Sequence, residues 1–97
     1  MNECKVVDEK TREYFQKILN GVEENKKYKK YMALGDPVRL SLYLTLLEDE
    51  LCVCQIENMT GMPQSTVSSH LKKLLEADLI EGRRDGKWIY YRSREWI

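Results

Sequence analysis

The feature that most constrains the fold of this chain is a tight turn, Gly61-Met62-Pro63, set between two runs of helical periodicity. Residues 55–60 suit a short helix that ends at the glycine, and residues 64–77 suit a longer, amphipathic one. The apolar positions of the longer helix lie about one turn apart and are Val67, Leu71, Leu74 and Leu75. A short helix, a glycine-containing turn and a longer helix form the spacing of a helix-turn-helix, whose second helix enters the DNA major groove.

The start of the longer helix carries an unusual number of small polar side chains. Helix propensity does not account for them, because serine and threonine are only middling helix formers, and capping explains one hydroxyl rather than a whole stripe. Short hydroxyl and amide groups can bond phosphates and base edges without filling the groove. The candidate DNA contacts are Gln64, Ser65, Thr66, Ser68 and Ser69, followed by His70, Lys72 and Lys73. For His70, packing or a phosphate contact is favoured over metal ligation.

The segments on either side of this pair predict a buried helix before it and a β-hairpin after it. Asp36-Pro37 is a strong helix start, because aspartate caps free amides and proline suits the first turn. Residues 38–47 are mostly apolar, which predicts a central, buried helix, and residues 51–53 suit a short extended segment. Residues 79–81 and 87–92 suit two strands around Asp85-Gly86, a favoured two-residue turn. Three helices and then a hairpin predict a winged helix-turn-helix, mainly α with a small β-hairpin.

The formal net charge of zero hides an uneven distribution. Residues 79–94 carry five basic and two acidic side chains, whereas residues 33–59 carry one basic and five acidic ones. Neutrality argues against bulk attraction to nucleic acid, but local basic patches are what phosphate contacts require. At the hairpin tip, Arg83, Arg84 and Lys87 have the chemistry of a wing that touches the DNA backbone or minor groove, with a basic solvated turn as the alternative. The lysines of residues 26–30 suit a solvated helix face.

A chain of 97 residues is predicted to form one domain, 1–97, small enough that a second copy helps to complete its core. Apolar side chains recur at helical spacing over residues 14–22, so this helix is expected to pack on the domain or on a second chain, with Gly21 as a candidate break. We therefore expect an N-terminal arm and dimerisation helix over 1–30 and a winged-helix core over 31–92. No apolar run approaches the roughly 20 residues of a membrane span, and residues 1–5 lack a signal-peptide core, so the expected location is the cytoplasm, without a membrane partner.

Two of the three cysteines, Cys52 and Cys54, lie one residue apart at the entrance to the helix-turn-helix. They are too close to cross-link separate elements, so free thiols fit better than a disulfide framework. Thiolates select soft ions such as As(III), Sb(III), Pb(II), Cd(II) or Bi(III) over Mg(II) or Ca(II). An ion bound at this position could therefore change how the helix-turn-helix binds DNA. In an extended segment the two thiols share a face, but they diverge once a helix starts. An ion that gathers both should therefore strain the start of the first helix.

Four short motifs, in order, carry a family likeness: ALGDPVR at residues 33–39, ELCVC at 50–54, QSTVSSHL at 64–71 and DGKWIYY at 85–91. Together they resemble the hallmarks of the arsenic-repressor (ArsR/SmtB) family of metal-sensing transcriptional repressors. The match covers about residues 31–92. The resemblance implies a homodimeric winged-helix repressor that releases its double-stranded operator when a metal or metalloid ion binds. The expected effector is As(III)/Sb(III), Cd(II) or Pb(II), and no resident cofactor is expected.

The sequence departs from the family pattern in three places. Arsenic-responsive members usually carry a third cysteine three residues after the pair, where this chain has Glu57, and the His/Asp pairs of the other common site are not found. By similarity to cadmium- and lead-sensing relatives, Cys4 is inferred to join Cys52 and Cys54, from the same chain or across the dimer. Relatives usually add a dimerising helix after the hairpin, so here the N-terminal helix is expected to carry more of the dimer contact.

Three other interpretations stay open at this point. Cys52 and Cys54 could be small buried apolar residues, with Cys4 incidental. The protein could be a redox-responsive or ligand-independent winged-helix regulator, since Cys4 could form a disulfide with Cys52 or with Cys54. A small thiol enzyme, such as a reductase or metal-transfer protein, belongs to another class. The sequence has no C-x-x-C and no glycine-rich nucleotide loop. Its single histidine lies on the longer helix of the helix-turn-helix, here called the reading helix. We therefore predict that the protein is not an enzyme.

Overall fold

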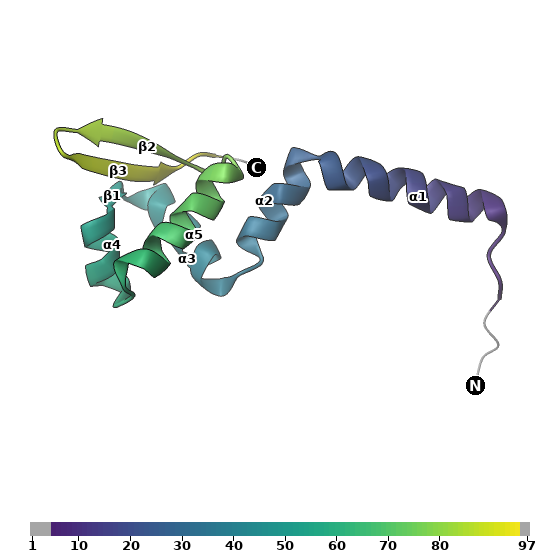
Figure 1. The fold of residues 1–97 in the computed structure, drawn as a ribbon, viewed down its shortest axis with the longest axis horizontal. Coiled ribbons are helices and arrows are strands. Elements are labelled where there is room, and N and C mark those ends of the chain that lie inside the picture. The colour runs from purple at the N-terminus through teal and green to yellow at the C-terminus, as the bar shows by residue number, and fades with distance from the viewer. Residues whose placement is uncertain (1–4, 96–97) are drawn as a thin grey trace.

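The structure, a computed structural model, describes residues 5–95 (Figure 1). These residues contain five helices and three strands. The helices are α1 (Glu9–Glu24), α2 (Lys26–Leu34), α3 (Pro37–Glu48), α4 (Val53–Thr60) and α5 (Gln64–Glu76). The strands are β1 (Leu51–Cys52), β2 (Ile80–Asp85) and β3 (Trp88–Ser93). Helices α3, α4 and α5, followed by the β2–β3 hairpin, confirm the predicted winged helix-turn-helix.

The turn of the helix-turn-helix is fixed by its backbone conformation. Gly61 has a left-handed φ of +75°, ends α4 and donates its N–H to the carbonyl of Glu57 at 2.8 Å. A residue with a Cβ is strained in this conformation, which is why a glycine marks the turn. Pro63 then caps α5 from an extended conformation.

The start of α3 is capped as the sequence predicts. The carboxylate of Asp36 accepts a hydrogen bond from the N–H of Val38 at 2.8 Å.

The core lies where the inner face of α5 meets α3, α4 and the start of β2. Its largest fully buried side chains are Leu42, Leu46, Ile56, Val67, Leu74 and Leu79. The prediction was wrong for Leu75, which the periodicity placed on the apolar stripe but which is 38% exposed. Leu75 lies about 100° further around the helix than Leu74, and this rotation carries it off the buried face.

Replacing Leu74 by alanine is expected to lower the free energy of unfolding by about 2–5 kcal/mol, because it leaves a cavity in the centre of the core. The Leu75→Ala variant is the matched control, since it deletes the same atoms from an exposed site and should change stability by about 0.5 kcal/mol or less. Chemical denaturation followed by circular dichroism measures both values. Equal losses in the two variants would contradict the assignment of Leu74 to the core.

The sheet has three strands rather than the predicted two, in the order β1-β3-β2, with both pairings antiparallel. Leu51 and Cys52 form the additional strand and pair with Tyr91 and Tyr90 of β3. The segment expected to be merely extended is therefore part of the wing sheet. Of the hairpin strands, β2 runs four residues further than predicted, whereas β3 has the predicted length and lies one residue later. Periodicity could not show this pairing, because it joins residues about 40 positions apart.

Helix α1 projects away from the rest of the molecule (Figure 1), and none of its residues is buried. It continues through Gly21, where the sequence suggested a break. Asn25 then caps α2 by accepting a hydrogen bond from the N–H of Lys27 at 2.8 Å. Packing of α1 on the core of its own chain, one of the two expectations, is therefore wrong for the described residues. The boundary expected between residues 30 and 31 falls inside α2.

The apolar side chains of α3 divide into two sets. The buried set is Leu42, Tyr43 and Leu46, and the exposed set is Leu40, Leu44 and Leu47. On α1, the exposed apolar side chains are Tyr14, Phe15, Ile18 and Val22. A single chain thus presents one uncovered apolar face on α3 and another on α1. None of the helices in residues 5–95 combines the length and the apolar character that crossing a membrane requires.

Candidate nucleic-acid interface and thiol site

The polar side chains at the start of α5 lie on the side of the helix away from the core. Gln64, Ser65, Ser68, Ser69, Lys72 and Lys73 are exposed, and Thr66 and His70 are half-buried. The N-cap is Pro63, so none of these hydroxyls serves as the N-cap of α5. The face therefore offers hydroxyl, amide and ammonium groups to a partner, and these groups bond phosphates and base edges.

His70 joins this face to the start of α3. Its Nδ1 lies 3.4 Å from Nη1 of Arg39, whose Nε donates to the carbonyl of Ala33 at 2.7 Å. A guanidinium can only donate, so Nδ1 of His70 is the acceptor in this contact. Nη1 of Arg39 also lies 3.8 Å from the carboxylate of Asp36, and the pKa of Asp36 is lowered, chiefly by the hydrogen bond from the backbone N–H of Arg39. His70 thus has a polar partner, Arg39, within the chain.

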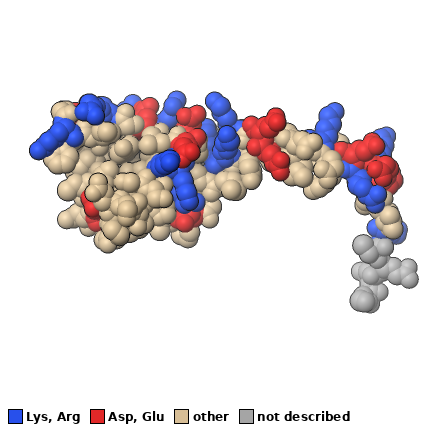
Figure 2. Space-filling model, in the orientation of Figure 1, with Lys and Arg blue, Asp and Glu red and all other residues tan. Residues whose placement is uncertain are grey.

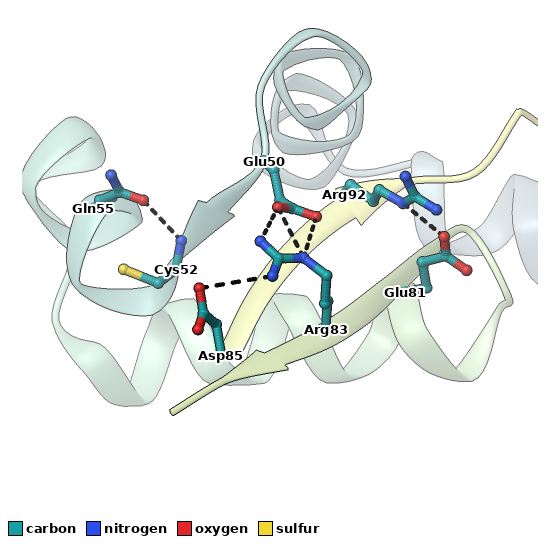
Figure 3. Close-up of polar contacts among 7 residues, drawn as sticks. All are labelled: Glu50, Cys52, Gln55, Glu81, Arg83, Asp85 and Arg92. Atoms are coloured by element: carbon teal, nitrogen blue, oxygen red, sulfur yellow. Dashed lines mark hydrogen bonds and ion pairs between the residues drawn. The ribbon is translucent and has the colours of Figure 1, made fainter. Parts of the chain in front are cut away.

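Arg83 on β2 is held by carboxylates (Figure 3). Its Nε donates to Oε1 of Glu50 at 3.2 Å, and its Nη2 donates to the same oxygen. These hydrogen bonds are the main cause of the lowered pKa of Glu50 and of the raised pKa of Arg83. The Nη1 atom of Arg83 lies 3.8 Å from Asp85, and the guanidinium lies 5.3 Å from the centroid of the Tyr90 ring. Unlike the other predicted wing contacts, Arg83 is already bound within the chain.

The other two predicted wing contacts, Arg84 and Lys87, are exposed. Lys and Arg side chains gather at the end of the molecule where the hairpin lies (Figure 2). Nζ of Lys87 lies 5.2 Å from the centroid of the Trp88 ring. The two-residue turn is Gly86-Lys87 rather than the predicted Asp85-Gly86, because Asp85 ends β2 and pairs with Trp88. Gly86 has a φ of +63°, which suits the first position of such a turn. These side chains are available to phosphate oxygens.

The two thiols of the Cys-x-Cys pair differ in their surroundings. Cys52 ends β1, acts as the N-cap of α4 and is 7% exposed, and its N–H donates to Oε1 of Gln55 at 3.0 Å (Figure 3). Cys54 lies in the first turn of α4 and is exposed. The extended segment ends at Cys52, so the pair has the diverging arrangement that a helix start produces rather than a shared strand face.

Both cysteines line a pocket of about 320 Å³ between the start of α4 and the hairpin. Glu57 of α4 and Gln64 at the start of α5 also line it. From the wing, Lys87 contributes to the same wall. The thiol pair, the reading helix and the wing therefore meet at one cavity.

The side chains at this pocket include ligand types that soft metal ions prefer. Cys52 and Cys54 supply two thiols, which bind soft metals as thiolates, and Glu57 adds a carboxylate at the same pocket. As(III) and Sb(III) take three thiolates, and within residues 5–95 no group of three or more His, Cys, Asp and Glu side chains is placed to hold a metal ion. Cys4, the expected third thiol, lies outside the described residues.

Sequence reasoning missed Glu50 and Tyr90 as parts of this region. Glu50 binds a residue 33 positions away, and Tyr90 lies opposite Cys52 in the β1–β3 pairing. The uneven charge distribution was the available signal, because acidic residues before the cysteines and basic residues in the hairpin are complementary. Without the sheet register, that signal could not identify the partners.

The chain matches known proteins over most of its length. Residues 36–81 match the model of the bacterial regulatory proteins of the arsR family. The chain is 40% identical over 85 residues to the biofilm growth-associated repressor of Xylella fastidiosa, a match that covers 88% of this chain and 70% of that protein. It is also 40% identical over 63 residues to the arsenical resistance operon repressor of Escherichia coli, covering 64% of this chain. The match spans about half of that repressor, 54% of its length.

A solved structure shows the same fold. It is the homodimeric winged helix-turn-helix DNA-binding domain of a possible ArsR-family transcriptional regulator from Mycobacterium bovis. The TM-score is 0.67 at 28% sequence identity, and the match covers 94% of this chain and 75% of the other. The fold is thus shared over nearly the whole chain.

The comparisons and the geometry agree. The matched proteins are DNA-binding transcriptional regulators and not enzymes, so the exclusion of an enzyme is confirmed. The four motifs that carried the resemblance lie on the start of α3, on β1 and α4, on α5 and on the hairpin. This chain therefore belongs to the arsR family of bacterial regulatory proteins.

Proposed function

We propose that this protein is a homodimeric transcriptional repressor that releases its operator when a soft metal or metalloid ion binds to its cysteine thiolates. The observation that carries the proposal is the single pocket shared by Cys52 and Cys54 with Gln64 and Lys87. An ion bound there lies beside groups from both DNA-facing elements. The name of the Escherichia coli relative, an arsenical resistance operon repressor, supports the same class of effector.

The proposed DNA contacts come from α5 and from the wing. On α5 they are Gln64, Ser65, Thr66, Ser68, Ser69, His70, Lys72 and Lys73. Their exposed polar face can enter the major groove, with hydroxyl and amide groups at its leading end. Arg84 and Lys87 add phosphate contacts from the hairpin. Arg83 belongs to the same tip, but Glu50 occupies its guanidinium.

The proposed ligands are Cys52, Cys54 and Cys4, the last from the same chain or from the partner. Three thiolates suit As(III) and Sb(III), and they also suit Pb(II). Cd(II) prefers a fourth ligand, for which the carboxylate of Glu57 in the same pocket is a candidate. Because side chains two residues apart diverge at a helix start, we expect an ion that binds both thiols to displace the end of β1 or the first turn of α4. This displacement is the proposed trigger for release.

The proposed dimer uses the N-terminal segment, residues 1–30. The apolar side chains of α1 are not covered by any other part of residues 5–95, and the Mycobacterium bovis relative is a homodimer. A second copy removes this surface from water, which is favourable in proportion to the area buried. Two copies also present two reading helices, which suit half-sites about 34 Å apart.

A titration of soft ions against the protein–DNA complex tests the proposal. The full chain is bound to a duplex from upstream of its own gene, and As(III), Sb(III), Cd(II) and Pb(II) are added in turn under a phosphine reductant. At least one ion should weaken binding by about 100-fold, which corresponds to about 2.7 kcal/mol of coupling. Mg(II) is the control and should have no effect. Unchanged binding with all four soft ions would rule out ion-induced release.

A redox-responsive regulator is the second candidate. The exposure of Cys54 favours it, because an accessible thiol is the one that oxidants reach. Adding hydrogen peroxide without ions or reductant separates the two mechanisms. Release by peroxide that a reductant reverses, together with no response to soft ions, would favour this alternative.

Replacing Arg84 or Lys87 by glutamine should weaken binding to every DNA sequence, because phosphate contacts carry no sequence information. Each lost contact should reduce the slope of log binding constant against log salt concentration by about 0.9. The Lys17→Gln variant removes the same charge from α1 and is the matched control. If the slopes of the wing variants equal that of the wild type, the wing does not contact phosphate.

A further inference from the structure

The strand that carries Cys52 is tied to the wing by side chains as well as by backbone (Figure 3). Glu50 lies in the short link between α3 and β1, two residues before Cys52. Both of its carboxylate oxygens accept from Nε of Arg83, at 3.2 and 3.3 Å, and Oε1 also accepts from Nη2. Arg83 lies in the middle of β2, so this bridge spans the sheet from the cysteine segment to the far hairpin strand.

The sheet register places Cys52 and Arg83 in one row, with Tyr90 between them. Cys52 pairs with Tyr90 on β3, and Tyr90 pairs with Arg83 on β2. The guanidinium of Arg83 lies over the Tyr90 ring, 5.3 Å from its centroid. Arg83 is thus held by Glu50 at the edge of its guanidinium and by Tyr90 at its face. Tyr90 pairs with Cys52, and Glu50 precedes Cys52 by two residues.

The charge of Arg83 is already compensated by carboxylates of its own chain. Nε and Nη2 are used by Glu50, and Nη1 lies 3.8 Å from the carboxylate of Asp85. Glu50 thus takes two of the five N–H groups of Arg83, and the two carboxylates offset its positive charge and repel a phosphate. Arg84 differs, because within residues 5–95 its side chain has no ion pair.

We propose that Glu50 and Arg83 are positioning residues that carry the displacement of the cysteine segment to the wing, and that Arg83 does not itself bind phosphate. This inference rests on the proposed ion-induced release. Closing the thiols of Cys52 and Cys54 on one ion shifts β1, and the bridge transmits the shift to β2. The tip cations, Arg84 and Lys87, then leave the DNA backbone together.

The test measures coupling in the full chain, with Cd(II) as the probe ion. For each variant, the ratio of the Kd for DNA with and without Cd(II) is determined, and Cd(II) binding is followed separately by thiolate charge-transfer absorption. The variants are Glu50→Gln, Arg83→Gln and the charge swap Glu50→Arg with Arg83→Glu. Glu81→Gln is the matched control, since it breaks the Glu81–Arg92 pair of 2.7 Å, which lies on the same sheet but does not reach the cysteine segment.

The wild-type ratio should be about 100. In Glu50→Gln and in Arg83→Gln the ratio should fall about tenfold or more, with Cd(II) absorption unchanged, and the charge swap should restore most of it. The salt slope of Arg83→Gln should equal that of the wild type, in contrast to a loss of about 0.9 for Arg84→Gln.

The possible failures are distinguishable. A wild-type ratio near one overturns the proposed function and this inference together. A normal wild-type ratio that persists in both bridge variants, or that falls equally in Glu81→Gln, overturns the inference alone. Loss of Cd(II) binding in the bridge variants, failure of the charge swap, or a reduced salt slope in Arg83→Gln also overturns it.

Discussion

A Cys54→Ser variant is expected to bind operator DNA like the wild type and to stay bound when As(III), Cd(II) or Pb(II) is added. Serine keeps the approximate size of the side chain but removes the soft sulfur donor, which these ions require. If wild-type release is about 100-fold, loss of one thiolate should remove most of the corresponding 2.7 kcal/mol or so of coupling. Fluorescence anisotropy of labelled DNA, with and without each ion, measures the two Kd values.

Cys52→Ser should give the same result, but it changes a buried position, so the exposed Cys54 provides the cleaner test. Val53→Ala is the matched control, because it alters the residue between the cysteines and keeps both sulfurs. A Cys4→Ser variant tests separately whether a third thiolate is required for ion-induced release. Normal release by the Cys54→Ser and Cys52→Ser proteins would refute the thiolate mechanism.

The second large effect is expected at the leading end of the reading helix. Gln64→Glu replaces an amide by a carboxylate of nearly the same shape, at the first residue of α5. The variant should bind operator about 5- to 150-fold more weakly, because a good amide-to-base contact contributes about 1–3 kcal/mol and the new charge also repels phosphate. The helix itself should be undamaged, since a negative charge is favourable at a helix N-terminus.

Gln16→Glu is the control for this change, because it adds the same charge to the exposed surface of α1. Both proteins are titrated against operator and against unrelated DNA at one salt concentration. The loss for Gln64→Glu should be larger on the operator than on unrelated DNA. Equal affinities of the two variants for the operator would remove Gln64 from the interface.

Local sequence signals predicted the part of the fold that local chemistry determines. Gly61 marked the turn because only glycine adopts its left-handed backbone conformation without strain. Asp36 marked the start of α3 through its capping hydrogen bonds. The buried stripe of α5 was predicted by periodicity alone, apart from Leu75. Each of these features depends on residues within about one helical turn of each other.

What the sequence could not predict depends on distant contacts. The pairing of β1 with β3 joins residues about 40 positions apart, and neither strand indicates its partner. For the same reason Arg83 could be recognised as a basic tip residue, but its engagement by Glu50 could not be foreseen. The lysine run was interpreted only as a solvated face, and its helix, α2, begins at a cap, Asn25, that the periodicity did not reveal.

The candidate site was predicted in composition but not in geometry. Cys52 and Cys54 were identified correctly as free thiols at the start of the helix-turn-helix, and both are free in the structure. Their opposite exposures follow from where β1 ends and α4 begins. The sequence placed the end of the strand one residue too late and the start of the helix two residues too late. So small a shift separates a shared strand face from a diverging pair, and the site is therefore more sensitive to boundary error than the fold is.

The strand order β1-β3-β2 has a consequence for how copies of this protein can associate. The outer strand β2 leaves backbone groups unpaired on one side, but four of its six residues are charged, which discourages edge-to-edge pairing and aggregation. The opposite border is β1, with only two residues, too short to template another strand. Growth of the sheet from chain to chain is therefore disfavoured at both borders, and the helices remain the surfaces through which self-assembly can proceed.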